Sequence, residues 1–192
     1  MVKIMKASAV ALLLSLNSIA VNAADYVIDT KGAHAFIQFR VMHLGYSWLY
    51  GRFNEFSGDF SFDPEKPDAS NIMVDINVDS IDSNHAERDK HLRGSKFLDV
   101  AQFPTAKFVS TRVEMANAES GTLYGNLSLK NVTKEVAIEF DVVGMGADPW
   151  GGQRVGFEGK TKFRMKDFNI MRDLGPLSQD VEMILSVEGI KK

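Results

Sequence analysis

The sequence predicts an all-β fold, a closed antiparallel β-barrel that carries a short helical insertion near its mouth. First, apolar and polar residues alternate along about eight segments, which is the pattern of strands with one buried face. Second, turn-forming clusters such as Asp63-Pro64 separate these segments, without the helical crossovers that parallel strands need. Third, only residues 84–104 look helical, and this stretch is dense in charge.

The predicted strands follow one another along the chain, each with an apolar side chain at every second position. They comprise residues 35–43, 58–62, 72–78, 107–113, 123–129, 136–142, 155–164 and 181–188. Such strands build either a sandwich or a barrel. Gly58, Gly125 and Gly159 lie within apolar faces, where a tightly curved sheet needs close backbone approach, and so they favour the barrel. Incidental strand glycines are the alternative explanation.

The helical insertion has a better defined start than end. Asn84 is expected to cap the helix, because Glu87 follows three residues later and can reach back to the cap. Gly94 is expected to end it.

The first residues predict a secretory signal peptide. Lys3 and Lys6 precede an apolar run over residues 7–16, which is too short to span a bilayer, and Val21-Asn22-Ala23 offers a small-residue cleavage site. We expect cleavage after Ala23, so that residues 1–23 form the signal peptide and residues 24–192 form one domain. Lys3 and Lys6 are the only charged residues before position 24, so cleavage would change the formal net charge from −3 to −5.

Composition excludes several classes of function. The chain has no Cys, so disulfides, thiolate chemistry and a lipid-modified N-terminal Cys are excluded. A mildly acidic domain is a poor candidate for binding nucleic acid, because such binding depends on Lys and Arg that neutralise phosphates.

No catalytic or metal site is predicted from the motifs. The chain lacks a Gly-x-Ser-x-Gly elbow as well as Cys, so we expect no catalytic nucleophile. His85, Glu87, Asp89 and His91 are candidate metal ligands, but six residues of helix put the two histidines on different faces. A solvated, salt-bridged helix face explains them better, so neither a metal nor a cofactor is expected.

Aromatic residues are concentrated near the start of the domain, with nine between residues 36 and 62. An eight-stranded barrel has an interior just large enough to be filled by side chains or to hold a small ligand. The total of 13 Phe, two Trp and four Tyr is compatible with an apolar cavity. Trp150, in the turn of residues 148–152, is expected to cover a barrel mouth, to contact a partner subunit or to plug the barrel end.

Seven stretches, in order along the whole domain, resemble the YceI-like polyisoprenoid-binding family, and in particular its periplasmic, enterobacterial-type members. They are Tyr26-Val27-Ile28-Asp29, His43-Leu44-Gly45-Tyr46-Ser47, Gly51-Arg52-Phe53, residues 84–93, Asp148-Pro149-Trp150-Gly151-Gly152, Lys166-Asp167-Phe168-Asn169 and Asp173-Leu174-Gly175-Pro176. One departure is Asn131-Val132-Thr133-Lys134-Glu135, where many relatives have Gly-Val-Thr-Lys-Pro. Asn also tolerates a left-handed turn, so this change leaves the fold unaffected.

The resemblance implies a lipocalin-like, eight-stranded antiparallel β-barrel that holds a long isoprenoid chain, such as a polyprenyl or quinone tail. Family members are exported, so the resemblance implies a periplasmic lipid-binding domain over residues 24–192, without an integral membrane segment. It also implies binding rather than catalysis and, as in some members, a homodimer.

The site residues follow from placing this lipid in the barrel. Ten aromatic side chains are expected to contact it, the last three of them near the mouth: Phe36, Phe39, Phe60, Phe62, Phe108, Phe157, Phe163, Trp48, Phe103 and Trp150. An anionic head group would need a local cation cluster, and the densest one is Arg88, Lys90, Arg93 and Lys96. A neutral quinone ring would need none.

Two alternatives remain open at this point. The protein could be an isoprenoid- or quinone-modifying enzyme that uses His43, His85 or His91 as an acid or base. It could instead be a structural barrel with a stress-response role, packed solid by its own side chains.

Overall fold

Eleven strands form one antiparallel sheet in the part of the chain that the computed structural model describes, residues 24–63 and 65–192. They are β1 (Ala24–Ile28), β2 (Ala35–His43), β3 (Ser47–Phe53), β4 (Phe56–Phe62), β5 (Asn71–Asn77), β6 (Ile81–Asp82), β7 (Thr105–Met115), β8 (Ser120–Leu129), β9 (Val132–Ala147), β10 (Gln153–Arg164) and β11 (Asp180–Lys191). The helices are α1 (Ala86–Arg93) and the 3-10 turns η1 (Pro67–Ala69), η2 (Val78–Ser80) and η3 (Met165–Phe168). The expected signal peptide, residues 1–23, lies outside the described residues.

Eight of these strands close a ring. The pairings run β1-β4-β5-β7-β8-β9-β10-β11, and β11 pairs back with β1. The predicted fold class, a closed eight-stranded antiparallel barrel with one short helix, is therefore confirmed. Closure leaves no free sheet edge around this ring.

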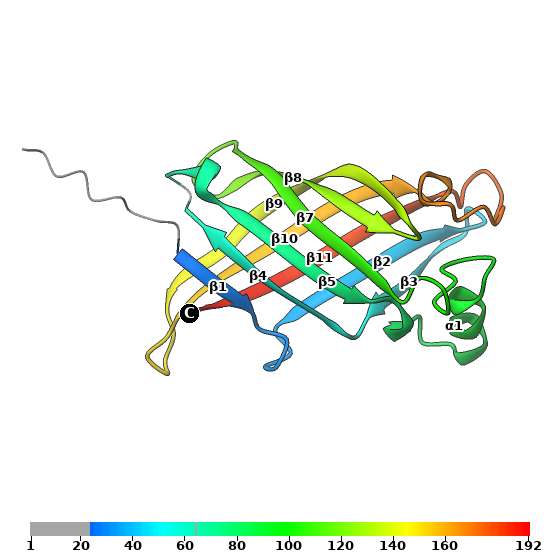
Figure 1. Cartoon of the computed structure of the whole chain (residues 1–192), viewed down its shortest axis with the longest axis horizontal. Helices are drawn as coiled ribbons and strands as arrows, with labels where there is room; N and C mark the ends of the chain where they lie inside the picture. Colours follow the sequence, from blue (N-terminus) through cyan, green and yellow to red (C-terminus); the bar gives the residue numbers. More distant parts are fainter. Residues whose placement is uncertain (1–23, 64) are drawn as a thin grey trace, which may run out of the picture.

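The remaining three strands form the wall at the α1 end of the barrel (Figure 1). Strand β11 pairs with β1 through residues 189–191 and with β2 through residues 182–187, so β1 and β2 lie end to end along one edge. Strand β3 pairs with β2, and β6 pairs with β3. The loop between η3 and β11 lies at the same end as α1, whereas the β9–β10 turn lies at the other (Figure 1).

Strands β1, β3 and β6 are absent from the predicted set because none of them shows clean alternation. In β3, Leu49 and Phe53 face the interior, but Trp48 and Tyr50 on the outer face are also aromatic, so the strand lacks a polar face. Strand β6 has only two residues, too few for a period to be visible.

Helix α1 begins one residue later than its predicted cap. His85 is the N-cap, and its Nδ1 accepts the N–H of Arg88 at 3.2 Å. Asn84 takes a left-handed conformation with φ of 60° instead, and its N–H donates to Asp82 Oδ1 at 2.8 Å. A residue in this conformation cannot be the N-cap, which is normally extended. Gly94 is the C-cap, as predicted.

Buried polar contacts fix α1 to the barrel. Asp89, 7% exposed, accepts the N–H of Ser83 at 2.8 Å and also the Ser83 hydroxyl. At the other end of the helix, Arg93 Nη2 donates to the carbonyl of Ile81 at 2.6 Å. Two of the charged residues that mark this segment in the sequence, Asp89 and Arg93, therefore position the helix at the barrel end.

Candidate functional site

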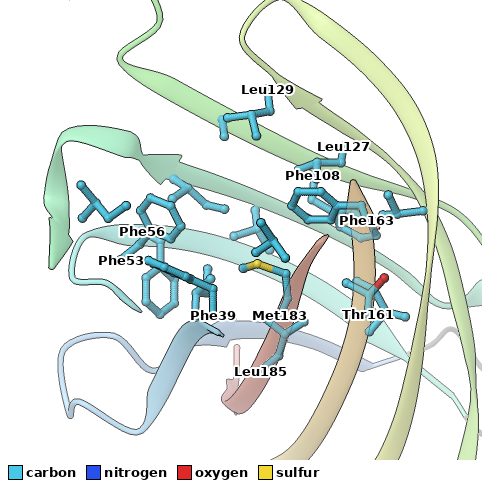
Figure 2. A pocket seen from close by; sticks show the side chains of 18 of the residues that line it. Phe39, Phe53, Phe56, Phe108, Leu127, Leu129, Thr161, Phe163, Met183 and Leu185 are labelled. Atoms are coloured by element: carbon cyan, nitrogen blue, oxygen red, sulfur yellow. The ribbon is translucent and has the colours of Figure 1, made fainter. Parts of the chain in front are cut away.

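The barrel interior holds a cavity of about 1010 Å³. This volume is at the upper end of the roughly 300–1,000 Å³ that small-molecule sites usually occupy. Its wall is built from the inward side chains of the strands, such as Val181, Met183, Leu185 and Val187 of β11. In Figure 2 the side chains of Phe39 and Phe108 point into the same space as Met183. The barrel is hollow rather than filled.

Glycines keep the lumen open by letting phenylalanine rings lie flat against the wall. A Cβ atom on Gly51 would overlap the ring of Phe39, and one on Gly125 would overlap the ring of Phe108. A Cβ atom on Gly189 would likewise overlap the ring of Phe60. Because each ring occupies the space where a neighbouring side chain would be, it does not project across the barrel axis.

Aromatic side chains pack against one another at the β1 end of the lumen. The rings of Tyr26 and Phe60 stack at a centroid distance of 5.0 Å. Phe157 makes edge contacts with Phe60, Phe62 and Phe140 at 5.7, 4.9 and 5.9 Å. Tyr26, Phe60 and Phe62 are each no more than 7% exposed. This cluster forms an apolar floor.

The opposite end of the lumen reaches solvent beside α1. Exposed residues among the cavity lining come mainly from the β2–β3 turn, from α1 with the residues after it, and from the η3–β11 loop: His43, Leu44, Lys90, His91, Ser95, Lys96 and Arg172. These three segments meet at one end of the barrel (Figure 1). We call this end the mouth.

Six of the ten predicted aromatic positions line the cavity, namely Phe39, Phe60, Phe62, Phe108, Phe157 and Phe163. Contact of these six with a lipid stays a prediction. Phe36, Trp48, Phe103 and Trp150 are not part of the cavity lining.

The sequence predicts Phe36 on the cavity wall and Trp48, Phe103 and Trp150 near the mouth. Strand direction and loop location correct Phe36 and Trp150, whereas Trp48 and Phe103 lie beside segments of the mouth but outside the cavity lining. Phe36 and Phe39 are three apart in β2, so they face opposite sides, and Phe36 is outward and 39% exposed. Trp48 is also outward, with the Arg40 guanidinium 4.1 Å from its ring centroid. Phe103 is half-buried in the segment after α1. Trp150, 79% exposed, lies in the β9–β10 turn at the end far from α1 (Figure 1).

Of the four predicted head-group residues, the two lysines have side chains without a partner among the described residues, and the two arginines are held by hydrogen bonds. Lys90 and Lys96 line the mouth, and within residues 24–63 and 65–192 neither makes a hydrogen bond or ion pair through its side chain. Arg88 also lines it, but its Nε donates to the Ser83 hydroxyl at 2.7 Å. Arg93 does not line it, because its guanidinium is bound to the carbonyls of Asp79 and Ile81. Arg172, which was not predicted, adds a cation to the mouth.

Sequence reasoning also missed the aliphatic part of the wall. Aliphatic and Met side chains line the cavity beside the phenylalanines, among them Leu127, Ile138, Met183 and Leu185. The alternation of β8, β9 and β11 already indicates which side chains face inward. The prediction named only aromatic residues as lipid contacts, and so it left out the inward-facing aliphatic and Met side chains.

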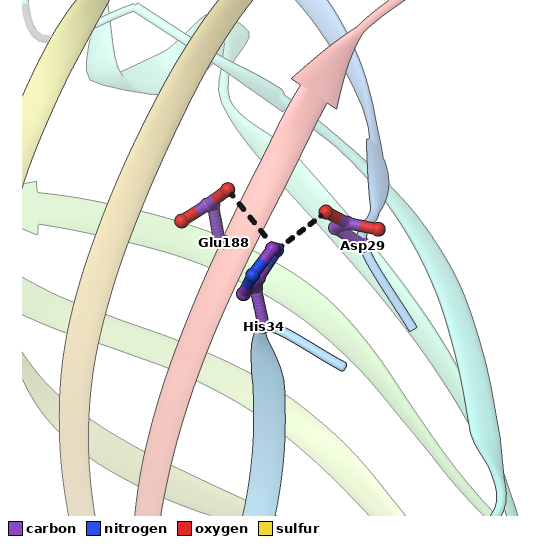
Figure 3. Close-up of side chains that lie close together, drawn as sticks. All are labelled: Asp29, His34 and Glu188. Carbon is purple, nitrogen blue, oxygen red and sulfur yellow. Dashed lines mark hydrogen bonds and ion pairs between the residues drawn. The ribbon is translucent and has the colours of Figure 1, made fainter. Parts of the chain in front are cut away.

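A polar cluster links the β1–β2 connection to β11 and to the β9–β10 turn, and Figure 3 shows three of its side chains, Asp29, His34 and Glu188. Asp29, 6% exposed, has Oδ2 at 2.9 Å from His34 Nδ1 and at 2.9 Å from Arg154 Nη1. Arg154 also binds Glu188 and, at 2.8 Å, Asp148. The hydrogen bonds from His34, from the N–H of Gly32 and from Arg154 lower the pKa of Asp29 to about 2, against the opposing effect of burial.

Asp29, His34 and Glu188 are, among the described residues, the group of three side chains close enough to share a metal ion, with ligand atoms within 4.8 Å. Arg154 donates to both carboxylates and so supplies the positive charge that an ion would bring. The sequence candidates are arranged differently: His85 caps α1, Asp89 is bound to Ser83, and His91 faces the mouth.

These features define a class of protein, a closed β-barrel with an apolar, ligand-sized lumen that opens at one end. Residues 26–189 match the model of the YceI-like domain, so the chain belongs to the YceI-like family. A protein named UPF0312 protein from Pseudomonas aeruginosa (strain LESB58) is 58% identical over 170 residues, covering 88% of each chain.

Solved structures share the fold. The Campylobacter jejuni YceI protein, 25% identical, superposes with a TM-score of 0.72 over 79% of this chain and 90% of that one. A polyisoprenoid-binding domain from Saccharophagus degradans, implicated in plant cell wall breakdown, is 14% identical, with a TM-score of 0.64 over 89% of this chain and 100% of that one. Within the described residues, no helix combines the length and the apolar character needed to cross a bilayer.

Proposed function

We propose that the protein is an exported carrier that binds a long isoprenoid lipid with its tail in the lumen and its head group at the mouth. The observation that carries this proposal is the 1010 Å³ cavity, because its wall is almost entirely aliphatic and aromatic from the floor to the mouth. The name of the Saccharophagus degradans domain supports the same ligand class. Export rests on the signal-peptide pattern of residues 1–23.

The energetics favour a long chain. Burying a methylene contributes roughly 0.8 kcal/mol, so a five-carbon isoprene unit contributes on the order of 4 kcal/mol before costs. Association costs about 4–15 kcal/mol, which a few buried units offset. The tail therefore supplies affinity, while the cations Lys90, Lys96 and Arg172 at the mouth would orient a polar or anionic head group.

The direct test is to express the full-length chain in a Gram-negative bacterium, purify it without detergent, and analyse organic extracts by mass spectrometry. The proposal predicts an isoprenoid lipid in near-stoichiometric amount and a mature N-terminus at Ala24. An extract without isoprenoid from folded protein would refute the carrier function. Recovery of chemically altered lipid after incubation would instead support an enzyme.

A matched pair of variants tests the lumen as the binding site. Phe157→Asp puts a charge on the cavity wall, whereas Lys160→Asp changes an exposed residue on the outer face of the same strand. Retained lipid is expected to fall at least tenfold in Phe157→Asp and to stay unchanged in Lys160→Asp, since desolvating the carboxylate costs several kcal/mol. Equal losses would contradict the assigned faces. Circular dichroism of both variants controls for folding.

A further inference from the structure

The mouth carries exposed apolar side chains, most of which do not line the lumen. Tyr46 is 87% exposed, Met171 73%, Leu177 64% and Leu44 56%. Tyr46, Met171 and Leu177 are absent from the cavity lining. Large apolar side chains gathered at one place on a soluble surface typically mark an interaction site, whereas scattered ones need no explanation. We call these four residues the rim.

The rim comes from two segments that hold each other in place. Leu44 and Tyr46 belong to the β2–β3 turn, and Met171 and Leu177 belong to the η3–β11 loop. The N–H of Leu44 lies 3.4 Å from the Ser178 hydroxyl. A Cβ on Gly45 would lie 2.8 Å from a methyl of Leu177, so the turn and the loop are in contact. The rim is thus one surface beside the opening.

Three cationic side chains lie at the same opening as the rim. Lys90, Lys96 and Arg172 are exposed and line the mouth, and their side chains lack ionic partners within residues 24–63 and 65–192. The nearby acids Glu87, Asp99 and Asp173 are outside the cavity lining. The charges of these three side chains at the opening are therefore opposite in sign to the net charge of the domain.

We propose that the rim docks the mouth onto a bilayer that contains anionic phospholipid, so that a lipid tail passes between the membrane and the lumen without crossing water. Apolar side chains next to Lys and Arg are the combination that binds the interface of anionic membranes. An apolar rim alone would suit many partners, but the cations on the opening favour an anionic surface. This inference rests on the proposed carrier function.

Flotation with vesicles tests the docking. Protein expressed from the full-length chain and purified after export is mixed with vesicles of phosphatidylglycerol and phosphatidylethanolamine, or of phosphatidylcholine alone, and then centrifuged through a density gradient. The protein is expected to float with the anionic vesicles and to float at least fivefold less with the neutral ones. Failure to float with either, or equal flotation with both, would overturn the proposal.

Two pairs of variants localise the contact. Tyr46→Ser with Met171→Ser removes the two most exposed rim residues. The control, Trp150→Ser with Met145→Ser, removes an aromatic and a Met of similar exposure at the far end.

The second pair tests the cations. Lys90→Glu with Lys96→Glu reverses two charges at the mouth, and the control, Lys31→Glu with Lys160→Glu, reverses two exposed charges elsewhere. The two mouth variants should bind anionic vesicles at least tenfold less. The charge variant loses two surface cations that each contribute about fivefold, and the rim variant loses apolar area that would be buried in the membrane interface. The control variants should float like the wild type, and equal losses would overturn the docking geometry.

Measuring bound lipid in the same preparations separates this proposal from the one on which it rests. Wild-type protein that carries isoprenoid but does not float would refute docking alone. Protein that floats through the rim but never contains isoprenoid would refute the carrier function alone. Since Tyr46 and Met171 lie outside the lumen, their variant should keep its isoprenoid while it loses flotation.

Discussion

At the scale of single residues, the open lumen depends on glycines, which have no side chain to compete with a neighbouring ring. Gly51, Gly125 and Gly189 each accept a phenylalanine ring flat against the wall. Gly125 and Gly159 already suggest close backbone approach in the sequence, but which ring meets which glycine depends on strand register, and no local pattern reveals it.

Gly125→Ala tests this role of glycine. The new methyl would overlap the Phe108 ring and also lie 2.7 Å from the carbonyl oxygen of Val109, so the ring must turn into the lumen. We expect the variant to bind less lipid and to lose about 1–3 kcal/mol in the free energy of unfolding, as for other overpacked sites. Gly144→Ala is the matched control, because nothing lies within 4 Å of its Cβ position. A lipid content equal to that of Gly144→Ala would contradict the prediction.

Asp29 illustrates a residue whose importance depends on distant partners. Arg154, which binds it, is 125 residues away in the chain, so sequence spacing gives no signal for the pair. The low pKa of Asp29, about 2, means that the folded state binds its proton more weakly than the unfolded chain does, whose Asp pKa is near 3.9. Its stabilising effect is therefore complete above about pH 4 and is lost as the pH falls through 2.

Asp29→Asn should remove this pH-dependent term. At neutral pH the variant is expected to lose on the order of 2 kcal/mol in the free energy of unfolding, and its stability should vary less than that of the wild type between pH 4 and pH 2. Urea unfolding across that range measures both quantities. Asp68→Asn, at an exposed carboxyl, serves as the control and should leave the profile of the wild type unchanged.

At the scale of elements, regular alternation predicts the long strands well, and irregular or short elements poorly. Strand β5 follows the period of two over its whole length, whereas β9 and β11 follow it over residues 136–142 and 181–188, so the faces of these segments are evident in the sequence. Strand β3 is not evident, because aromatic residues occupy both of its faces. The assignment of both Phe36 and Phe39 to the lumen failed for a related reason, since it followed residue type rather than strand geometry.

Lys130 joins two of the elements that surround the mouth. It is 8% exposed in the β8–β9 turn, and its Nζ donates to the carbonyl of Phe97 at 2.6 Å and to that of Asn169 at 3.1 Å. The segment after α1 is thereby tied to the end of η3. A single buried cation, which composition cannot distinguish from a surface lysine, thus holds two loops together.

Lys130→Met should loosen the mouth without opening the barrel. Both carbonyls lose a donor, at a cost of about 1–3 kcal/mol each where water cannot replace it. We expect faster amide hydrogen exchange in residues 94–103 and 165–172 and faster release of bound lipid, with unchanged exchange in β9 and β10. Lys134→Met, which removes an exposed lysine 3.5 Å from Asp167, is the control. Protection at the mouth equal to that of the wild type would contradict this role.

At the scale of the whole molecule, the barrel is stable around an interior that its own side chains do not fill. Inward residues such as Leu185 and Val187 lack packing partners on the side that faces the cavity. A ligand that fills the cavity would supply those contacts and would bind only the folded state. Binding and stability are therefore linked.

Lipid removal tests that linkage. Protein freed of lipid by unfolding and organic extraction, then refolded, should melt at a lower temperature than protein given back a polyprenyl lipid. At a free lipid concentration of 100 times Kd the gain is about 2.7 kcal/mol, which for a domain of this size corresponds to roughly 5–10 °C in Tm. Leu185→Glu places a charge in the lumen and should show little shift, whereas Ser186→Glu, on the outer face, should respond as the wild type does. A shift of equal size in both variants would mean that the lipid stabilises the barrel from outside the lumen.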